Sequence, residues 1–242
     1  MSGLFAKSSI PVGLIVLLAS CSGCGTGEYK SRLDARLPQL SQETPFSRMY
    51  AATAIADTPV KVRIPQFFKN SPLVEGLPAE APVDSRRAKP PFDIDDLKLA
   101  YEDFVTDSSG GKVSYYCYLA VTDMSRPGAR DPSAALWQRL RTMFTETPLN
   151  PTEVQYPRPD GRGIQWKKAV TAGPQEFYYQ DKNGAGSYRP ENGTIQTYCR
   201  REGDFMVLIV WRVPQRVEKN VGNLGLDQWA GRVAGTVMVE GG

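Results

Sequence analysis

Alternation of apolar and polar residues dominates the chain from residue 92 onward, and a period of two is typical of half-buried β-strands. The segment 205–213 is instead apolar at almost every position, which favours a strand buried on both faces in the middle of a sheet. Together these patterns predict six strands, at residues 97–105, 112–122, 164–170, 176–180, 194–201 and 205–213.

Glycine-containing turns separate the strands, because glycine accepts the positive φ that tight turns need. Residues 107–111 (DSSGG) and 202–204 (EGD) predict hairpins between the first two and the last two strands. Asn183-Gly184 and Asn192-Gly193 are turn dipeptides and predict two more turns. The short connections favour antiparallel pairing.

Two helices interrupt this pattern. Asp131 followed by Pro132 is an N-cap with proline at the first helical position, and apolar residues then recur on one face through Thr147. A last helix begins near Leu226 and Asp227. The order strand, strand, helix, four strands, helix predicts an α+β fold in which helices pack on the faces of an antiparallel sheet.

The chain before this region is punctuated by proline. Seven prolines lie between residues 58 and 91, a density that argues against regular helix or central strand. We expect residues 21–91 to form a spacer, a short amphipathic helix over 28–40 and a proline-rich extended segment. The boundary near Pro91 then leaves residues 92–242 as the α+β domain.

The first twenty residues have the three parts of a secretory signal peptide. Lys7 is followed by an apolar stretch of about nine residues, which is too short to span a bilayer. Small residues then precede Cys21. Leu18-Ala19-Ser20-Cys21 resembles the lipobox of bacterial lipoproteins, and the whole chain is similar to uncharacterised bacterial lipoproteins.

The lipobox resemblance implies removal of residues 1–20 and acylation of Cys21 by a diacylglyceryl group and an amide-linked chain such as palmitate. Several acyl chains hold a protein firmly on a membrane. Ser22, in place of aspartate, implies the outer membrane, facing the periplasm, if the envelope is Gram-negative. The alternative is an ordinary signal peptide that is cut nearby and leaves a free cysteine.

Composition narrows the chemistry further. The chain has no histidine, which excludes Ser-His-Asp and Cys-His catalysis and the common histidine-ligated zinc sites. A net charge of +3, with 29 basic and 26 acidic residues interspersed, lacks the concentrated basic stripe that binds nucleic acid. We expect no cofactor, no metal and no nucleic-acid partner.

The predicted element order of residues 92–242 resembles the PsbP-like αβα sandwich. The resemblance rests on topology and on aromatic strands such as 163–166 (GIQW) and 207–211 (VLIVW), and it transfers no functional residue. Fold similarity alone is weak evidence for function.

Three features admit a binding interpretation beside a structural one. Tyr116 and Tyr118 share one side of a strand, residues 160–163 (DGRG) could bind an anion through backbone donors, and Asp93, Asp95 and Asp96 could hold calcium. Ordinary sheet packing, a simple turn and solvated acids at a strand start are the favoured interpretations.

Cys117 and Cys199 both fall on apolar positions of predicted strands and should point inward. An oxidising compartment makes a disulfide between them possible. Two buried free thiols that behave as small apolar side chains are the alternative.

Two classes of function remain. The favoured class is a non-catalytic binding or assembly module, anchored through Cys21 and presented to another envelope protein or polymer. The other class is an enzyme that uses carboxylates or a tyrosine on an envelope component, and the lack of histidine and of a nucleophile motif disfavours it.

The lipid anchor predicts that Cys21→Ala releases the protein from washed membranes or leaves the precursor uncleaved, because the acyl chains are attached to that residue. Cys24→Ala is the matched control and should change neither outcome. Partitioning of both variants between detergent and aqueous phases is the measurement, and an unchanged Cys21→Ala protein in the detergent phase would contradict the anchor.

Overall fold

The computed structural model describes residues 30–32, 36–37, 44–68, 90–144 and 149–240. The chain divides into two units, Met1–Thr44 and Pro45–Gly242. In the first unit, residues 30–32 and 36–37 are helical, within the range predicted for a short helix. The predicted signal peptide, Cys21 and most of the proline-rich segment lie outside the described residues.

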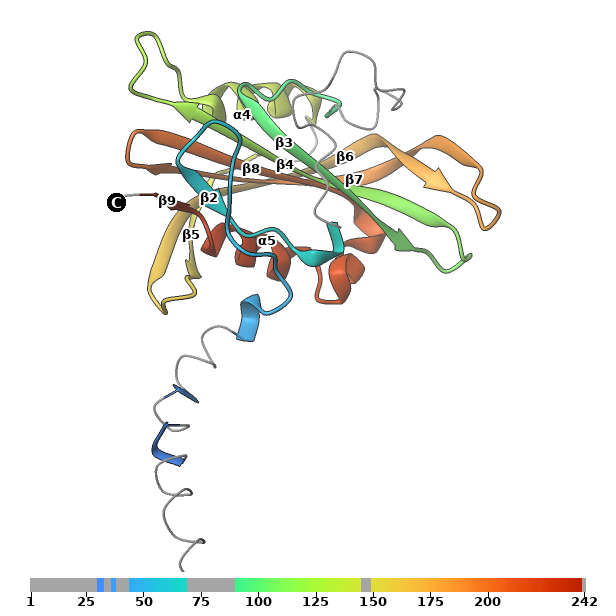
Figure 1. Ribbon diagram of the computed structural model, residues 1–242. Coiled ribbons are helices and arrows are strands. Elements are labelled where there is room, and N and C mark those ends of the chain that lie inside the picture. The colour runs from blue at the N-terminus through green and yellow to red at the C-terminus, as the bar shows by residue number, and fades with distance from the viewer. Residues whose placement is uncertain (1–29, 33–35, 38–43, 69–89, 145–148, 241–242) are drawn as a thin grey trace, which may run out of the picture. The chain divides into compact units, whose positions relative to one another are not determined.

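The second unit is built on a six-stranded sheet in the order β3-β4-β8-β7-β6-β5, with every neighbouring pair antiparallel (Figure 1). The predicted antiparallel α+β class is therefore confirmed. The strands are β3 (Leu97–Thr106), β4 (Lys112–Asp123), β5 (Thr152–Pro157), β6 (Gly163–Gln180), β7 (Gly186–Glu202) and β8 (Phe205–Pro214).

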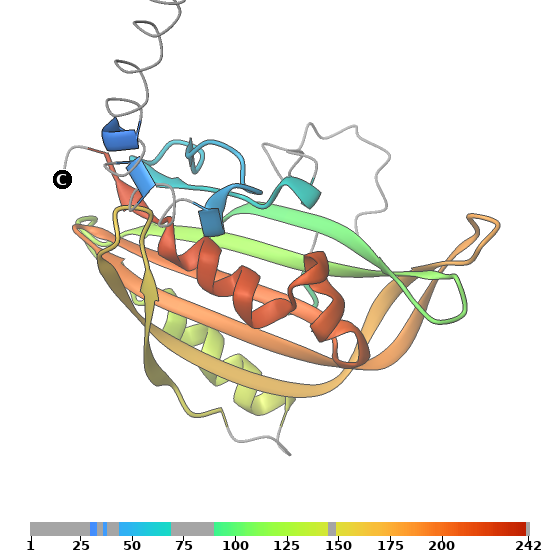
Figure 2. The ribbon, with the colours of Figure 1, turned by 90° about the horizontal axis from the view of Figure 1, so that it is seen from below.

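Two α-helices, α4 (Pro132–Met143) and α5 (Leu226–Gly235), lie on opposite faces of this sheet (Figures 1 and 2). Asp131 caps α4 as predicted, since its carboxylate accepts from the backbone N–H of Ser133 at 2.8 Å. Within the described residues, no helix has the length and apolar character to cross a membrane.

Adjacent residues of β7 each form a hydrogen bond with one of the two helices. The indole Nε1 of Trp137 on α4 donates to Thr197 at 2.8 Å, whereas Gln196 donates to Asp227 on α5 at 3.0 Å. Successive strand residues point to opposite faces, so these two contacts place one helix on each face.

A smaller antiparallel sheet, in the order β1-β2-β9, joins the beginning of the second unit to its end. Its strands are β1 (Thr53–Ala54), β2 (Val60–Val62) and β9 (Met238–Val239). Three 3₁₀ helices complete the described structure, η1 (Thr44–Phe46), η2 (Gln66–Phe68) and η3 (Gln215–Asn223).

The long hairpin of β6 and β7 corrects two predictions. Residues 164–170 and 176–180 belong to one strand, and Asn192-Gly193 lies inside β7 instead of in a turn. Gly173 pairs with Gly193 across the hairpin. Both glycines make room for neighbouring rings, because a methyl group would collide with Phe144 at Gly173 and with Phe177 at Gly193. The strand β5 was not predicted.

The predicted domain boundary near Pro91 is wrong, because the compact unit begins at Pro45. The aromatic ring of Phe68 is 2% exposed and lies 5.4 Å from that of Tyr101 and 5.8 Å from that of Trp211 between centroids. Prolines shorten the strands of this segment, yet its apolar side chains join the core: Phe46, Met49, Ile55, Val60, Val62, Ile64 and Phe68.

This packing predicts that Phe68→Ala lowers the free energy of unfolding by about 3–5 kcal/mol, because it empties a ring-sized space in the core. Met143→Ala is the control, since the Met143 side chain is 47% exposed, and it should change stability by less than ~0.5 kcal/mol. Denaturant unfolding measures both. Equal midpoints for Phe68→Ala and the wild type would show that residues 45–68 are not part of the core.

Candidate anion-binding pocket

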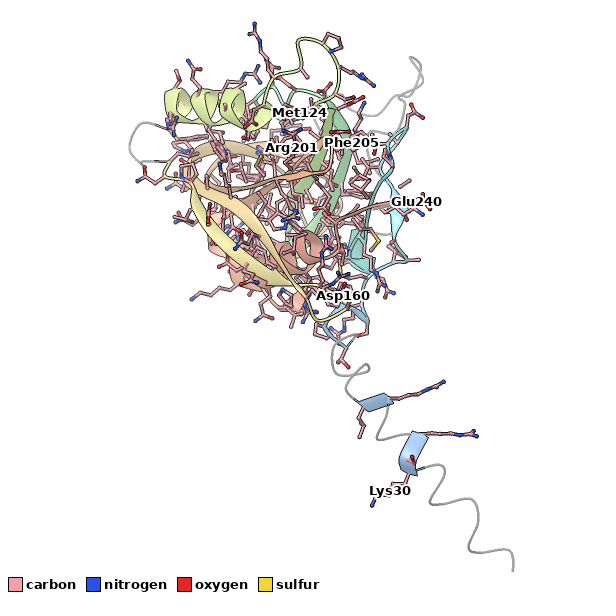
Figure 3. All side chains as sticks on the ribbon, turned by 90° about the vertical axis from the view of Figure 1, so that its left-hand side faces the viewer. Lys30, Met124, Asp160, Arg201, Phe205 and Glu240 are labelled. Carbon is pink, nitrogen blue, oxygen red and sulfur yellow. The ribbon has the colours of Figure 1, made fainter. Side chains whose placement is uncertain are left out.

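A pocket of about 490 Å³ lies where the β5–β6 turn, the β7–β8 turn, the end of α5 and β9 meet. Three arginines line it, Arg63 from the end of β2 and Arg158 and Arg162 from the β5–β6 turn, together with the carboxylates of Asp160 and Glu202. Figure 3 shows Asp160 at the edge of the second unit, on the tip of this turn. Residues nearly 100 positions apart in the chain therefore share one cavity.

The β5–β6 turn is held by its own backbone. The N–H of Arg158 donates to the carbonyl of Arg162 at 2.7 Å, and the N–H of Gly161 donates to the carbonyl of Arg158 at 2.9 Å. Gly161 has φ +80°, which favours glycine. The carboxylate of Asp160 accepts from the backbone N–H of Arg162 at 2.9 Å. These backbone donors are satisfied inside the turn, which confirms the turn interpretation of residues 160–163.

The side chains, not the backbone, give the pocket its binding capacity. The Nε of Arg63 and the Nε of Arg158 are both buried, and neither has a hydrogen-bond partner among the described residues. The Nη2 of Arg158 donates to Glu202 at 3.3 Å and to the carbonyl of Val237 at 3.1 Å, so this guanidinium is held in place. A buried N–H without a partner costs free energy, and neither guanidinium has all its donors satisfied within the described part of the protein.

The charges of the pocket favour an anion. Glu202 is shared, because the Nε of Arg200 also donates to it, at 2.5 Å. Asp160 is held by Arg162 at 2.7 Å, and this hydrogen bond is the main cause that lowers the pKa of Asp160. Arg63 has no carboxylate partner in the described part of the chain. Three guanidiniums against two carboxylates leave positive charge in excess, and Arg200 adds to it.

A second pocket, of about 280 Å³, lies beside the start of α4 and is lined by residues that include Asp131, Glu153, Lys167 and Arg201. Three basic side chains, Lys167, Arg200 and Arg201, stand there against the two acidic ones, but Arg200 is paired with Glu202 and Arg201 with Asp204. The N-terminus of α4 is already satisfied by Asp131, which also accepts from the hydroxyl of Ser133 at 2.6 Å. This pocket therefore has no charge preference comparable with that of the arginine-lined pocket.

Tyr116 and Tyr118 are buried, which confirms their structural interpretation. Their rings stack with centroids 5.9 Å apart, and the guanidinium of Arg212 lies 5.1 Å from the centroid of the Tyr116 ring and 4.4 Å from that of Phe177. Burial, the largest cause, raises the pKa of Tyr118 to about 12, which disfavours a tyrosinate at neutral pH. No pattern in the sequence pointed to the buried Arg212.

The aspartates near the start of β3 bind other groups of the protein, and the carbonyl of Asp93 accepts from Arg139 at 2.8 Å. Asp95 accepts from both Nη atoms of Arg139 at 3.1 Å, while Asp96 accepts from the hydroxyl of Thr122 at 2.7 Å. In the described ranges, no three acidic or cysteine side chains gather as ligands for a metal. These carboxylates therefore act as hydrogen-bond and ion-pair partners, not as a calcium site.

Of the two alternatives left open for Cys117 and Cys199, a disulfide or two buried free thiols, the structure has the free thiols. Cys117 pairs with Trp211 and Cys199 with Leu208 on opposite sides of β8, and Trp211 and Leu208 point to opposite faces of the sheet. One strand thus separates the two cysteines, and their thiols lie on different faces. Both are buried, as expected.

Comparison with known proteins adds no family to this description, since no protein-family model and no curated protein matches the chain. The arginine-lined pocket, in which guanidiniums outnumber carboxylates, is therefore the feature of the described residues that bears on function.

The buried thiols predict slow alkylation. Desolvation raises the pKa of Cys199 to about 11 and that of Cys117 well above its usual range, so the reactive thiolate is scarce at pH 8. Iodoacetamide at pH 8 should modify both cysteines in denaturant and neither in the native protein. Peptide mass spectrometry without reductant measures this, and a peptide pair bridged through Cys117 and Cys199 would contradict the structure.

Proposed function

We propose that the chain is a bacterial envelope lipoprotein, anchored through lipid on Cys21, whose folded unit is a non-catalytic binding module. The lipobox-like residues Leu18 to Cys21 support the anchor. The arginine-lined pocket supports binding, and its ligand is an anionic group of an envelope component. In a Gram-negative envelope the module stands on the outer membrane and faces the periplasm.

One observation carries this proposal. Arg63 and Arg158 line the same cavity, and both guanidiniums keep hydrogen-bonding capacity, since their Nε atoms have no partner in the described ranges. Guanidinium groups form planar, charge-assisted hydrogen bonds with carboxylates and phosphates, often two at once. A carboxylate or phosphate group in the cavity would offset the excess charge.

The enzymatic alternative has less support. Asp160 is held by Arg162, which lowers the pKa of that carboxylate and opposes proton transfer near neutral pH, while Glu202 accepts hydrogen bonds from Arg158 and Arg200. The arrangement of α4 and α5 on opposite faces of the sheet supports the proposed PsbP-like architecture, which itself implies no activity.

The proposal predicts that inorganic phosphate raises the melting temperature of the protein, because a ligand that binds only the folded state stabilises it. Arg63→Gln should weaken phosphate binding roughly tenfold or more, since a hydrogen bond to a charged group contributes about 1.5–3 kcal/mol. Arg158→Gln should act in the same direction. Titration calorimetry and thermal unfolding, at constant ionic strength, measure both effects.

Arg189→Gln is the matched control, because Arg189 is exposed and lies near the far end of the β6–β7 hairpin. It removes the same charge away from the pocket and should leave phosphate binding unchanged. Acetate replaces phosphate in a parallel titration to test a carboxylate. If neither anion binds, or if Arg189→Gln weakens binding as much as Arg63→Gln, the pocket is not an anion site.

A further inference from the structure

We infer that the anion bound by the arginine-lined pocket is the phosphate of a lipid headgroup, in the same membrane that holds the anchor. This inference rests on the proposed function and names the ligand class for that site. It requires that the pocket lie where the chain enters the folded unit, that positive charge extend beyond the pocket, and that apolar surface adjoin it.

The chain enters the folded unit beside the pocket. Phe46, the second residue of that unit, is 2% exposed. A methyl group on Gly235 would lie 3.8 Å from the Phe46 ring, and Gly235 lines the pocket. Phe46, a buried residue at the start of the unit, and the pocket therefore lie at the same end of α5.

The anchor restricts how far this end can move from the membrane. Cys21 and Pro45 are 24 positions apart, and a chain of that length spans at most about 85 Å even when fully extended. Tethering converts headgroup binding into an intramolecular event with a high effective concentration. A pocket with only weak affinity for one headgroup can then be occupied for much of the time.

A further basic side chain, Arg232, lies on α5 three residues before the pocket residue Gly235. Arg232 lies one turn before Thr236, whose hydroxyl oxygen accepts from the backbone N–H of Arg63 at 3.0 Å. Burial, and after it the charge of Arg48, lower the pKa of Arg232, which places the two cations close together. Neither Arg48 nor Arg232 forms an ion pair with any described residue. Basic groups of this kind are attracted to anionic membrane surfaces.

Apolar surface borders the same pocket. Met238 and Val239, both half-buried on β9, line it together with the arginines. A phosphodiester headgroup carries a glycerol backbone and acyl chains next to its charge, and these groups need an apolar neighbour. A small soluble anion gains nothing from such a neighbour, so the combination favours the lipid.

The test uses the chain from residue 21 onward with Cys21→Ser, which keeps the whole folded unit and carries no lipid. Sedimentation with vesicles of phosphatidylcholine that contain phosphatidylglycerol is compared with sedimentation with vesicles of phosphatidylcholine alone. We expect binding to the anionic vesicles, competition by glycerol 3-phosphate, and at least fivefold weaker binding for Arg63→Gln. Arg63→Lys, which keeps the charge and loses the planar donors, should lie between Arg63→Gln and the wild type.

Control measurements separate the possible failures. Arg189→Gln should bind vesicles like the wild type, and equal losses for Arg189→Gln and Arg63→Gln would overturn the inference in favour of unspecific charge attraction. If inorganic phosphate binds but anionic vesicles do not, the headgroup inference fails and the proposed anion site stands. If neither binds, both fail. Thermal unfolding of each variant shows that the pocket residue, not the fold, causes the loss.

Discussion

The adjacent inner strands β4 and β8 bury side chains on both faces, and this double burial governs the rest of the second unit. Leu208 and Ile209 are neighbours on β8 that point to opposite faces, and both are fully buried. Both faces of the sheet must therefore be covered by other parts of the chain. The helix α4 covers one face, while α5, with residues from the first part of the unit, covers the other (Figure 2). The arginine-lined pocket lies where one of these covers ends.

Sequence patterns correctly predicted the elements that depend on residues close together in the chain. Asp131-Pro132 defined the start of α4, and the turns at 107–111 and 202–204 lie between the strands that they were expected to join. The β6–β7 hairpin was harder to predict. Asn192-Gly193 is a turn dipeptide in isolation, but continuous pairing across the hairpin and the space that Gly193 leaves for Phe177 keep it extended.

Packing between residues that are far apart in the chain could not be predicted from the sequence. Proline spacing correctly excludes long helices and strands around residues 58–68, but it says nothing about burial, and Phe68 is held by rings that come from β3, β4 and β8. The same limit applies to Cys117 and Cys199. Alternation shows that each thiol is buried, yet only strand order shows that β8 lies between them and that they face opposite sides.

The candidate site shows the same division between local and long-range information. The glycine-rich residues 160–163 drew attention to the correct turn, but the turn uses its own backbone donors, and Asp160 binds Arg162. The decisive residue, Arg63, follows β2 and reaches the pocket through a small sheet that joins it to β9. No periodicity or motif in the sequence links Arg63 with Arg158.

The pocket is well suited to bind without moving. The carbonyl of Pro157 leaves no space for a methyl group at Gly235, so the end of α5 lies directly against the start of the β5–β6 turn. Arg158 is fixed by Glu202 and by the carbonyl of Val237, which hold its guanidinium before any ligand arrives. Such preorganisation reduces the entropy lost on binding. Because Asp160 and Glu202 are already engaged by arginines, Arg63, which has no carboxylate partner in the described residues, is the lining cation most available to an incoming anion.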